Sequence, residues 1–249
     1  MQKRIFTIGL ILALVAACGV QLTVVSAVRS GGKAQPTRFK VRIENIASPE
    51  GQTASDGTKW PFAISPGAWV LDSRSNPLFR PGKKALPNSL EAQAEDGNPA
   101  MLVQSLEQSH HNSTLHGIFN TPVGATTPGP VTPGGAYEFT ISATPGMRLS
   151  FTMMFGQSND LFYAPDSAIA FFDAKGQPVS GDITSRLILW DAGTEVNQEP
   201  GIGPDQAPRQ KAPNTGTSES KKIAPVKDGF TYPKTSEVLR VTITPDAAQ

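Results

Sequence analysis

Cysteine is almost absent from this sequence, which has a single one, Cys18, among its 249 residues. Because Cys18 lies in the apolar N-terminal stretch, the rest of the chain can form no internal disulfide. A surplus of one charge is missing too, since 22 Lys and Arg residues face 21 Asp and Glu residues. The net charge of +1 gives no reason to expect nucleic acid or a strongly acidic molecule as a partner.

The sequence also lacks the common catalytic signatures. It contains no Gly-x-Ser-x-Gly elbow, no His-Glu-x-x-His pair and no Walker phosphate loop. Its only histidines are His110, His111 and His116. Their spacing suits zinc or copper, but their Asn, Ser and Thr neighbours favour a solvated loop. We therefore expect a protein that is not an enzyme.

Glycine and proline are plentiful, at 23 and 22 residues, which indicates many turns and short strands. Hydrophobic residues make up 38% of the chain, enough to form a core. Four segments alternate apolar and polar residues with a period of two, at 39–43, 137–141, 149–155 and 239–243. Together with shorter apolar runs, they predict an antiparallel sandwich of seven or eight strands.

Several local features refine this prediction. Pro145 and Gly146 separate two alternating segments, which predicts a hairpin. The sequence Ser-Pro-Gly at 65–67 predicts a turn, and residues 187–190, apolar on both faces, predict a central strand. A short helix is expected at 88–96, capped by Asn88 and stopped by Gly97, with a second helix starting at Asn98 and Pro99.

The N-terminus predicts export. Lys3 and Arg4 precede an apolar stretch at residues 5–17, as in a signal peptide. Val-Ala-Ala-Cys at 15–18 resembles a lipoprotein lipobox, in which Cys18 would carry the lipid. Cleavage near Ala27, or an uncleaved anchor over 5–28, are the alternatives. We expect a targeting segment at 1–30, a tether at 31–36 and one domain at 37–249, in the cell envelope or secreted.

Two polar segments attract attention, at 157–165 and 190–195, because each places acidic side chains just after an apolar run. Carboxylates from neighbouring loops are what calcium requires, with six to eight oxygen ligands. The alternative is that these side chains simply cap turns. Phe162 and Tyr163 follow the first acidic residue and, if partly exposed, would contact a glycan, a lipid surface or a protein. The alternative for these rings is core packing.

The chain resembles the spondin N-terminal domain family, and especially its bacterial secreted members. The resemblance rests on the order of several motifs over about 37–245, such as Phe-Lys-Val-Arg-Ile-Glu-Asn-Ile at 39–46, Ser-Pro-Gly at 65–67, Ala-Glu-Asp-Gly at 94–97, Phe-Asn-Thr-Pro at 119–122, Ser-Asn-Asp at 158–160 and Trp-Asp-Ala-Gly-Thr-Glu at 190–195. It implies a C2-like antiparallel β-sandwich that binds one calcium ion.

The resemblance also implies the ligands, which are Asp160, Asp191 and Glu195 when the family's motifs are matched position by position. Asn159 and Thr194 then shape the loops beside them. Animal relatives are modules of extracellular adhesion proteins, so the expected function is recognition of an extracellular or cell-surface protein or glycan. An envelope protein that binds carbohydrate or lipid is the alternative, and a hydrolase that uses the paired carboxylates is a third hypothesis.

Overall fold

The computed structural model describes residues 35–72, 76–108 and 115–246. Residues Ala34–Gln249 form one compact unit. The predicted targeting segment with Cys18 lies outside the described residues, as do His110 and His111. In the part of the chain that is described, no helix combines the length and apolar character needed to cross a membrane.

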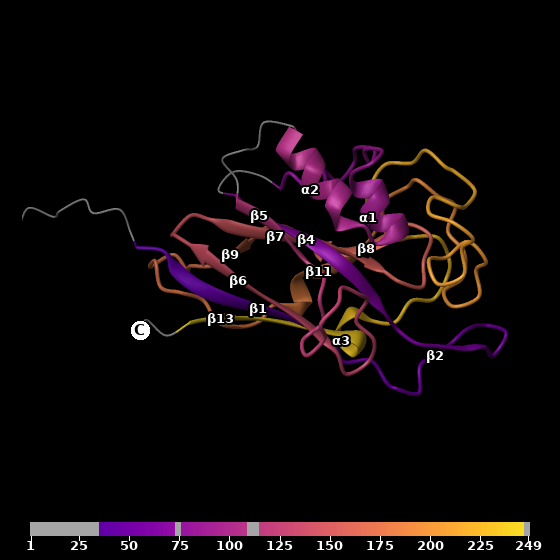
Figure 1. Ribbon diagram of the computed structural model, residues 1–249, viewed down its shortest axis with the longest axis horizontal. Helices are drawn as coiled ribbons and strands as arrows, with labels where there is room; N and C mark the ends of the chain where they lie inside the picture. Colours follow the sequence, from indigo (N-terminus) through magenta and orange to yellow (C-terminus); the bar gives the residue numbers. More distant parts are fainter. Residues whose placement is uncertain (1–34, 73–75, 109–114, 247–249) are drawn as a thin grey trace, which may run out of the picture. The chain divides into compact units, whose positions relative to one another are not determined.

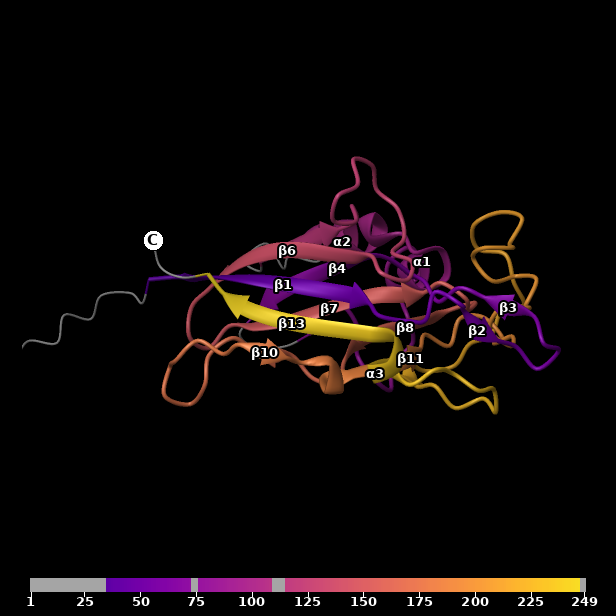
Figure 2. The same ribbon diagram turned by 90° about the horizontal axis from the view of Figure 1, so that it is seen from below.

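Two antiparallel sheets form the fold (Figures 1 and 2). The smaller sheet has four strands, in the order β10 (Gly181–Asp182), β13 (Leu239–Pro245), β1 (Thr37–Asn45) and β6 (Ala136–Ala143). The larger sheet runs in the order β12 (Ala224–Pro225), β11 (Leu187–Asp191), β8 (Leu161–Pro165), β7 (Arg148–Phe155), β4 (Ile64–Asp72) and β5 (Leu115–Phe119), and β9 (Ile169–Ala170) also pairs with β7.

Short elements complete the chain. A small hairpin of β2 (Gln52–Thr53) and β3 (Lys59–Trp60) stands apart from both sheets in the strand pairing. Helices α1 (Leu90–Asp96) and α2 (Pro99–Gln108) follow β4, and the single turns η1 (Thr184–Arg186) and α3 (Thr235–Val238) precede β11 and β13. The prediction of an antiparallel all-β sandwich is confirmed.

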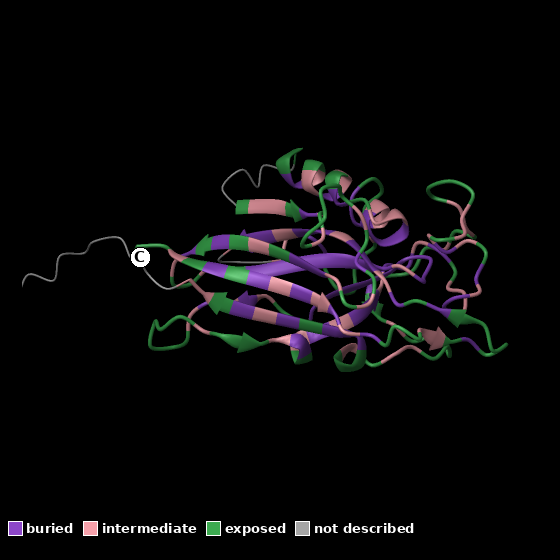
Figure 3. Ribbon diagram, turned by 60° about the horizontal axis from the view of Figure 1, so that its bottom comes forward, coloured by how far each residue is buried: buried purple, intermediate pink, exposed green. Residues whose placement is uncertain are grey.

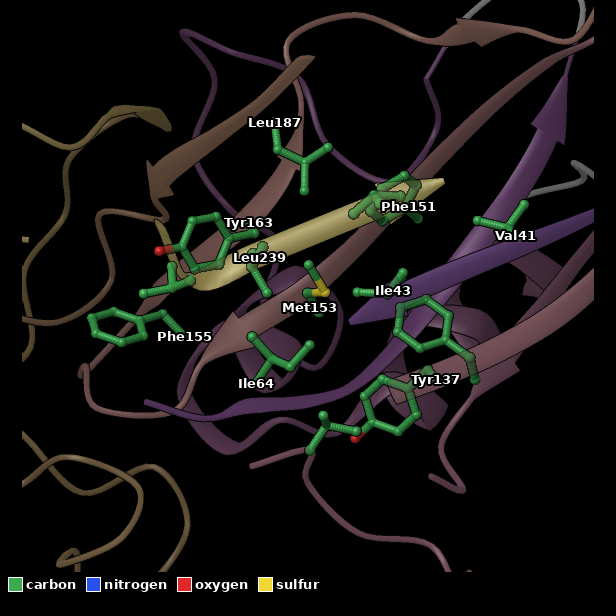
Figure 4. Packing of buried hydrophobic residues seen from close by; sticks show 14 of the residues in the cluster. Val41, Ile43, Ile64, Tyr137, Phe151, Met153, Phe155, Tyr163, Leu187 and Leu239 are labelled. Carbon is green, nitrogen blue, oxygen red and sulfur yellow. The ribbon is translucent and has the colours of Figure 1, made fainter. Parts of the chain in front are cut away.

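The main core fills the space between the two sheets. Figure 4 shows side chains from both sheets meeting there, among them Ile43, Phe151, Met153, Tyr163 and Leu239. Alternation along β1 produces this arrangement, because its inward side chains are buried while their neighbours reach solvent (Figure 3).

A second core lies on the other face of the larger sheet, beneath α1 and α2. It contains Val70 of β4, Phe162 of β8 and Trp190 of β11, packed against Ala94 and Leu102 of the helices. Strands β7 and β8 are therefore covered on both faces, and every side chain of β8 is buried. This double coverage explains the long apolar runs in the central strands.

Two local predictions are wrong. The segments at 137–141 and 149–155 form β6 and β7, which belong to different sheets, so Pro145 and Gly146 connect two layers instead of closing a hairpin. Residues 65–67 lie within β4, where the register with β7 shifts between Ile64 and Gly67. The predicted turn is thus a bulge in a long strand.

The helix predictions are partly confirmed. Asn88 does not cap α1, because its φ of +52° places it outside the helix and Ser89 occupies the N-cap position. Gly97 does end the helix, in the left-handed conformation with φ +63°. The Asn98 side chain accepts a hydrogen bond from the Ala100 N–H at 3.1 Å, as expected for the N-cap of a helix that begins at Pro99.

Candidate metal centre

The first acidic segment is a tight turn between β7 and β8. The Ser158 hydroxyl donates to the Phe155 carbonyl at 2.6 Å and accepts from the Leu161 N–H at 3.1 Å. These two bonds close the turn and place Asp160 immediately before β8. Asp160 is completely buried.

The second acidic segment begins where β11 ends. The register of β11 with β8 pairs Asp191 with Leu161, and the Ala192 N–H donates to the Asp160 carbonyl at 3.2 Å. Antiparallel pairing of two adjacent strands therefore brings the two segments together. The prediction that the two segments form neighbouring loops is confirmed.

Asp191 shapes its own loop. Its Oδ1 accepts from the Gly193 N–H at 2.7 Å, and its Oδ2 accepts from the Asn197 side chain at 2.9 Å. Gly193 has φ +71°, and a Cβ there would lie 2.8 Å from the Cβ of Lys221. Glycine is thus required both by the backbone conformation and by the close approach of the neighbouring segment.

The Asp160 carboxylate is satisfied on one side only. Its Oδ2 accepts from the Thr194 N–H at 2.7 Å, from the Thr194 hydroxyl at 3.2 Å and from the Glu195 N–H at 3.1 Å. Its Oδ1 is buried and has no hydrogen-bond partner. Burial, followed by the charge of Asp191, raises the pKa of Asp160 to about 7. The buried, unpartnered oxygen thus lies within electrostatic reach of a second carboxylate.

Glu195 faces a different set of neighbours. Its Oε2 accepts from the Asn159 side chain at 3.4 Å, and a Cβ at Gly216 would lie 2.2 Å from the same oxygen. Burial raises the pKa of Glu195, and the charges of Asp205, Asp96 and Glu91 add to that rise. Among the described residues, no group of three or more His, Cys, Asp or Glu side chains is arranged to hold a metal ion.

Glu95 was not found from the sequence. It lies in the last turn of α1, is 2% exposed, and its Oε2 has no hydrogen-bond partner. Burial, with smaller contributions from the charges of Glu195, Glu91 and Asp160, raises its pKa to about 8. A carboxylate at a helix C-terminus also opposes the helix dipole. The sequence feature that could have singled out Glu95 is this acidic position at a helix C-terminus, since α1 has no basic residue in its last turn.

Few positive charges offset these acids. Burial raises the pKa of Asp191, and the charge of Lys221 offsets only part of that rise, while the Lys221 ammonium pairs with Glu219 at 2.6 Å. Among the described ion pairs, none includes Asp160, Asp191, Glu195 or Glu95. Buried carboxylates without a cation are costly, so Asp160 and Asp191 fit a hard cation by donor chemistry and by the unpartnered oxygen. The Glu195 side chain contacts Asn159 instead.

Phe162 and Tyr163 are not available to a partner. Both are fully buried: Phe162 belongs to the core beneath the helices, and Tyr163 lies in the core between the sheets, where Figure 4 shows it. The prediction of partner contact is wrong because β8 is covered on both faces. His116 lies in β5, 3.5 Å from a Glu107 carboxylate oxygen.

No protein-family model matches this chain, and no curated protein matches it either.

Proposed function

We propose that the protein is an exported, non-catalytic β-sandwich module that binds one calcium ion and recognises an extracellular or cell-surface protein or glycan. The observation that carries the calcium part is the Asp160 carboxylate, which is buried, has an unpartnered oxygen and lies beside Asp191 without a cation. The recognition part rests on the resemblance to spondin domains and on the export signal.

Asp160 and Asp191 would hold the ion through carboxylate oxygens, and Glu195 would complete the acidic ligands after turning from Asn159. Calcium accepts backbone carbonyls and water in its remaining positions. The ion would neutralise carboxylates that the fold has removed from water. It would also pin the loop after β11 to the turn before β8, in a domain that has no disulfide to do so.

A segment that is distant in sequence is hydrogen-bonded to that loop. The Val196 N–H donates to the Thr217 carbonyl at 2.8 Å, and the Lys221 N–H donates to the Gly193 carbonyl at 2.9 Å. Residues 217–221 therefore lie alongside the proposed metal-binding loop and hydrogen-bond to it, although they are distant from it in sequence. A bound ion would order this whole end of the sandwich and present it as a fixed surface to a partner.

Thermal unfolding of residues 34–249 with calcium or with EDTA tests the proposal. Every described residue of both hydrophobic cores lies in this segment, so we expect it to fold without the preceding residues. Calcium at a hundredfold excess over Kd should add about 2.7 kcal/mol of stability. That corresponds to a rise in Tm of about 5–10 °C.

Asp191→Asn and Glu195→Gln should each reduce the calcium-dependent shift. Asp173→Asn is the matched control, because Asp173 also accepts backbone N–H groups in a turn but is exposed. An identical Tm in calcium and EDTA would exclude the ion. Binding of the calcium-loaded domain to arrays of glycans and matrix proteins tests the recognition part separately.

A further inference from the structure

A turn that precedes α1 presents a cluster of positive charge. The Lys83 N–H donates to the Arg80 carbonyl at 3.1 Å across Pro81 and Gly82, and Gly82 has φ +78°. Proline followed by a glycine of positive φ is the signature of a type II turn. Two further bonds of 2.8 Å, between Gly82 and Ile223 and between Ile223 and Lys83, fix the turn against a distant segment.

A cavity of about 330 Å³ lies beside this turn, between it, the start of α1 and the end of α2. In Figure 1 the chain that precedes α1 runs beside both helices. The cavity has the size range of small-ligand sites. Its lining is mainly apolar and includes Pro77, Leu78, Phe79, Ala85, Leu86, Leu90, Leu106 and Ile223.

The charged residues that line the cavity are all positive. They are Arg80, Lys83 and Lys84, each exposed, and no Asp or Glu lines it. Lys84 donates to the Ser220 hydroxyl at 2.6 Å, while Arg80 and Lys83 form no ion pair within the described part of the chain. In a chain with a net charge of +1, this is a local excess of positive charge.

Leu86 lines the cavity and extends its apolar character to the protein surface. It is 64% exposed, and no other large exposed hydrophobic residue of the described chain lines this cavity. Three exposed cations beside an exposed leucine are complementary to an anionic, amphiphilic surface.

We propose that Arg80, Lys83, Lys84 and Leu86, which we call the cationic surface, dock on a bilayer that contains anionic phospholipid. The cations meet the lipid headgroups, Leu86 enters the interface, and the cavity accepts an acyl chain. Cations near an anionic leaflet and one inserted apolar side chain are the two contributions that hold interfacial proteins on membranes. This site is separate from the metal centre.

Vesicle flotation of residues 34–249 in EDTA tests the proposal without the metal centre. We expect binding to phosphatidylcholine vesicles that contain phosphatidylglycerol, and none to phosphatidylcholine alone. Each cation contributes about a fivefold factor, so Arg80→Gln/Lys83→Gln should weaken binding about 25-fold. Leu86→Ser should weaken it about tenfold. Circular dichroism melts confirm that the variants fold.

The matched control is Lys175→Gln/Lys227→Gln, which removes two exposed lysines that do not line the cavity. This variant should bind as the unmodified domain does. Equal binding to both vesicle types, or equal loss in the control, overturns the proposal. Binding of free laurate or of an acidic peptide without vesicle binding also overturns it, and assigns the surface to a soluble amphiphile or to a protein partner.

Discussion

We call Asp160, Asp191, Glu195 and Glu95 the acidic centre. The acidic centre and the cationic surface are two regions of opposite charge that share one segment. Residues 217–223 join them, since the Glu219 N–H donates to the Thr194 carbonyl at 2.7 Å and the Ile223 N–H donates to the Lys83 carbonyl at 2.8 Å. Asp160, Glu195 and Glu95 are buried and Asp191 is half-buried, whereas the cations are exposed. The protein thus groups like charges in two places, one largely buried and one exposed to solvent.

This difference determines how each region responds to its surroundings. Buried like charges are strongly unfavourable, because little water screens them, so they bind a proton or a cation. Exposed like charges are screened by salt within about 10 Å at 0.1 M, so they persist without a partner. We therefore expect the acidic centre to control stability and the cationic surface to control association.

The largest effect is expected from Asp160→Ala. This change leaves the Thr194 and Glu195 N–H groups buried without their acceptor. Each unsatisfied donor costs about 1–3 kcal/mol, so the free energy of unfolding should fall by about 3–5 kcal/mol. Urea denaturation measures it. Asp160→Asn keeps one acceptor oxygen and should cost far less in EDTA; equal losses in the two variants would contradict the assigned hydrogen bonds.

The pH dependence comes next. In the metal-free domain the pKa values of Asp160 and Glu95 are raised to about 7 and about 8, from ordinary values of 3.8 and 4.5. Raised pKa values favour the protonated forms in the folded state. Their stabilisation is complete below pH 4 and is lost as the pH rises towards 8.

We therefore expect a higher Tm at pH 5 than at pH 8 in EDTA, and free energies of unfolding that differ on the order of a few kcal/mol. Calcium should restore stability at pH 8, because it replaces the lost protons. Glu95→Gln should flatten the upper part of the profile. A metal-free domain that is equally stable at both pH values would show that these carboxylates are not buried in solution.

The smallest effect is expected from Lys83→Gln/Lys84→Gln. Both side chains are exposed, and the hydrogen bond from the Lys84 ammonium to the Ser220 hydroxyl is exposed to solvent. The free energy of unfolding should change by less than about 0.5 kcal/mol. Urea denaturation of this variant and of Asp160→Ala compares the two losses in the free energy of unfolding directly. A loss of several kcal/mol would mean that the lysines hold the fold together and are not free for association.

Much of the local structure could be predicted from the sequence. Alternation identified β1, β6, β7 and β13, and Gly97 and Pro99 marked helix ends as expected. The meeting of the two acidic segments was also predicted. Partners of strands were not, because alternation shows which face is buried and says nothing about which strand lies alongside. Glu95 was missed because it reaches the centre from a helix outside both segments.

The sequence by itself determined the sandwich class, the absence of a disulfide after Cys18 and the position of acidic residues at two strand ends. Only the tertiary structure decided that β7 and β8 are covered on both faces, which buries Phe162 and Tyr163. It also decided that Asp160 loses water on one side and gains no partner there. Burial depends on layers contributed by distant segments, and the local sequence pattern does not show which segments cover a given strand.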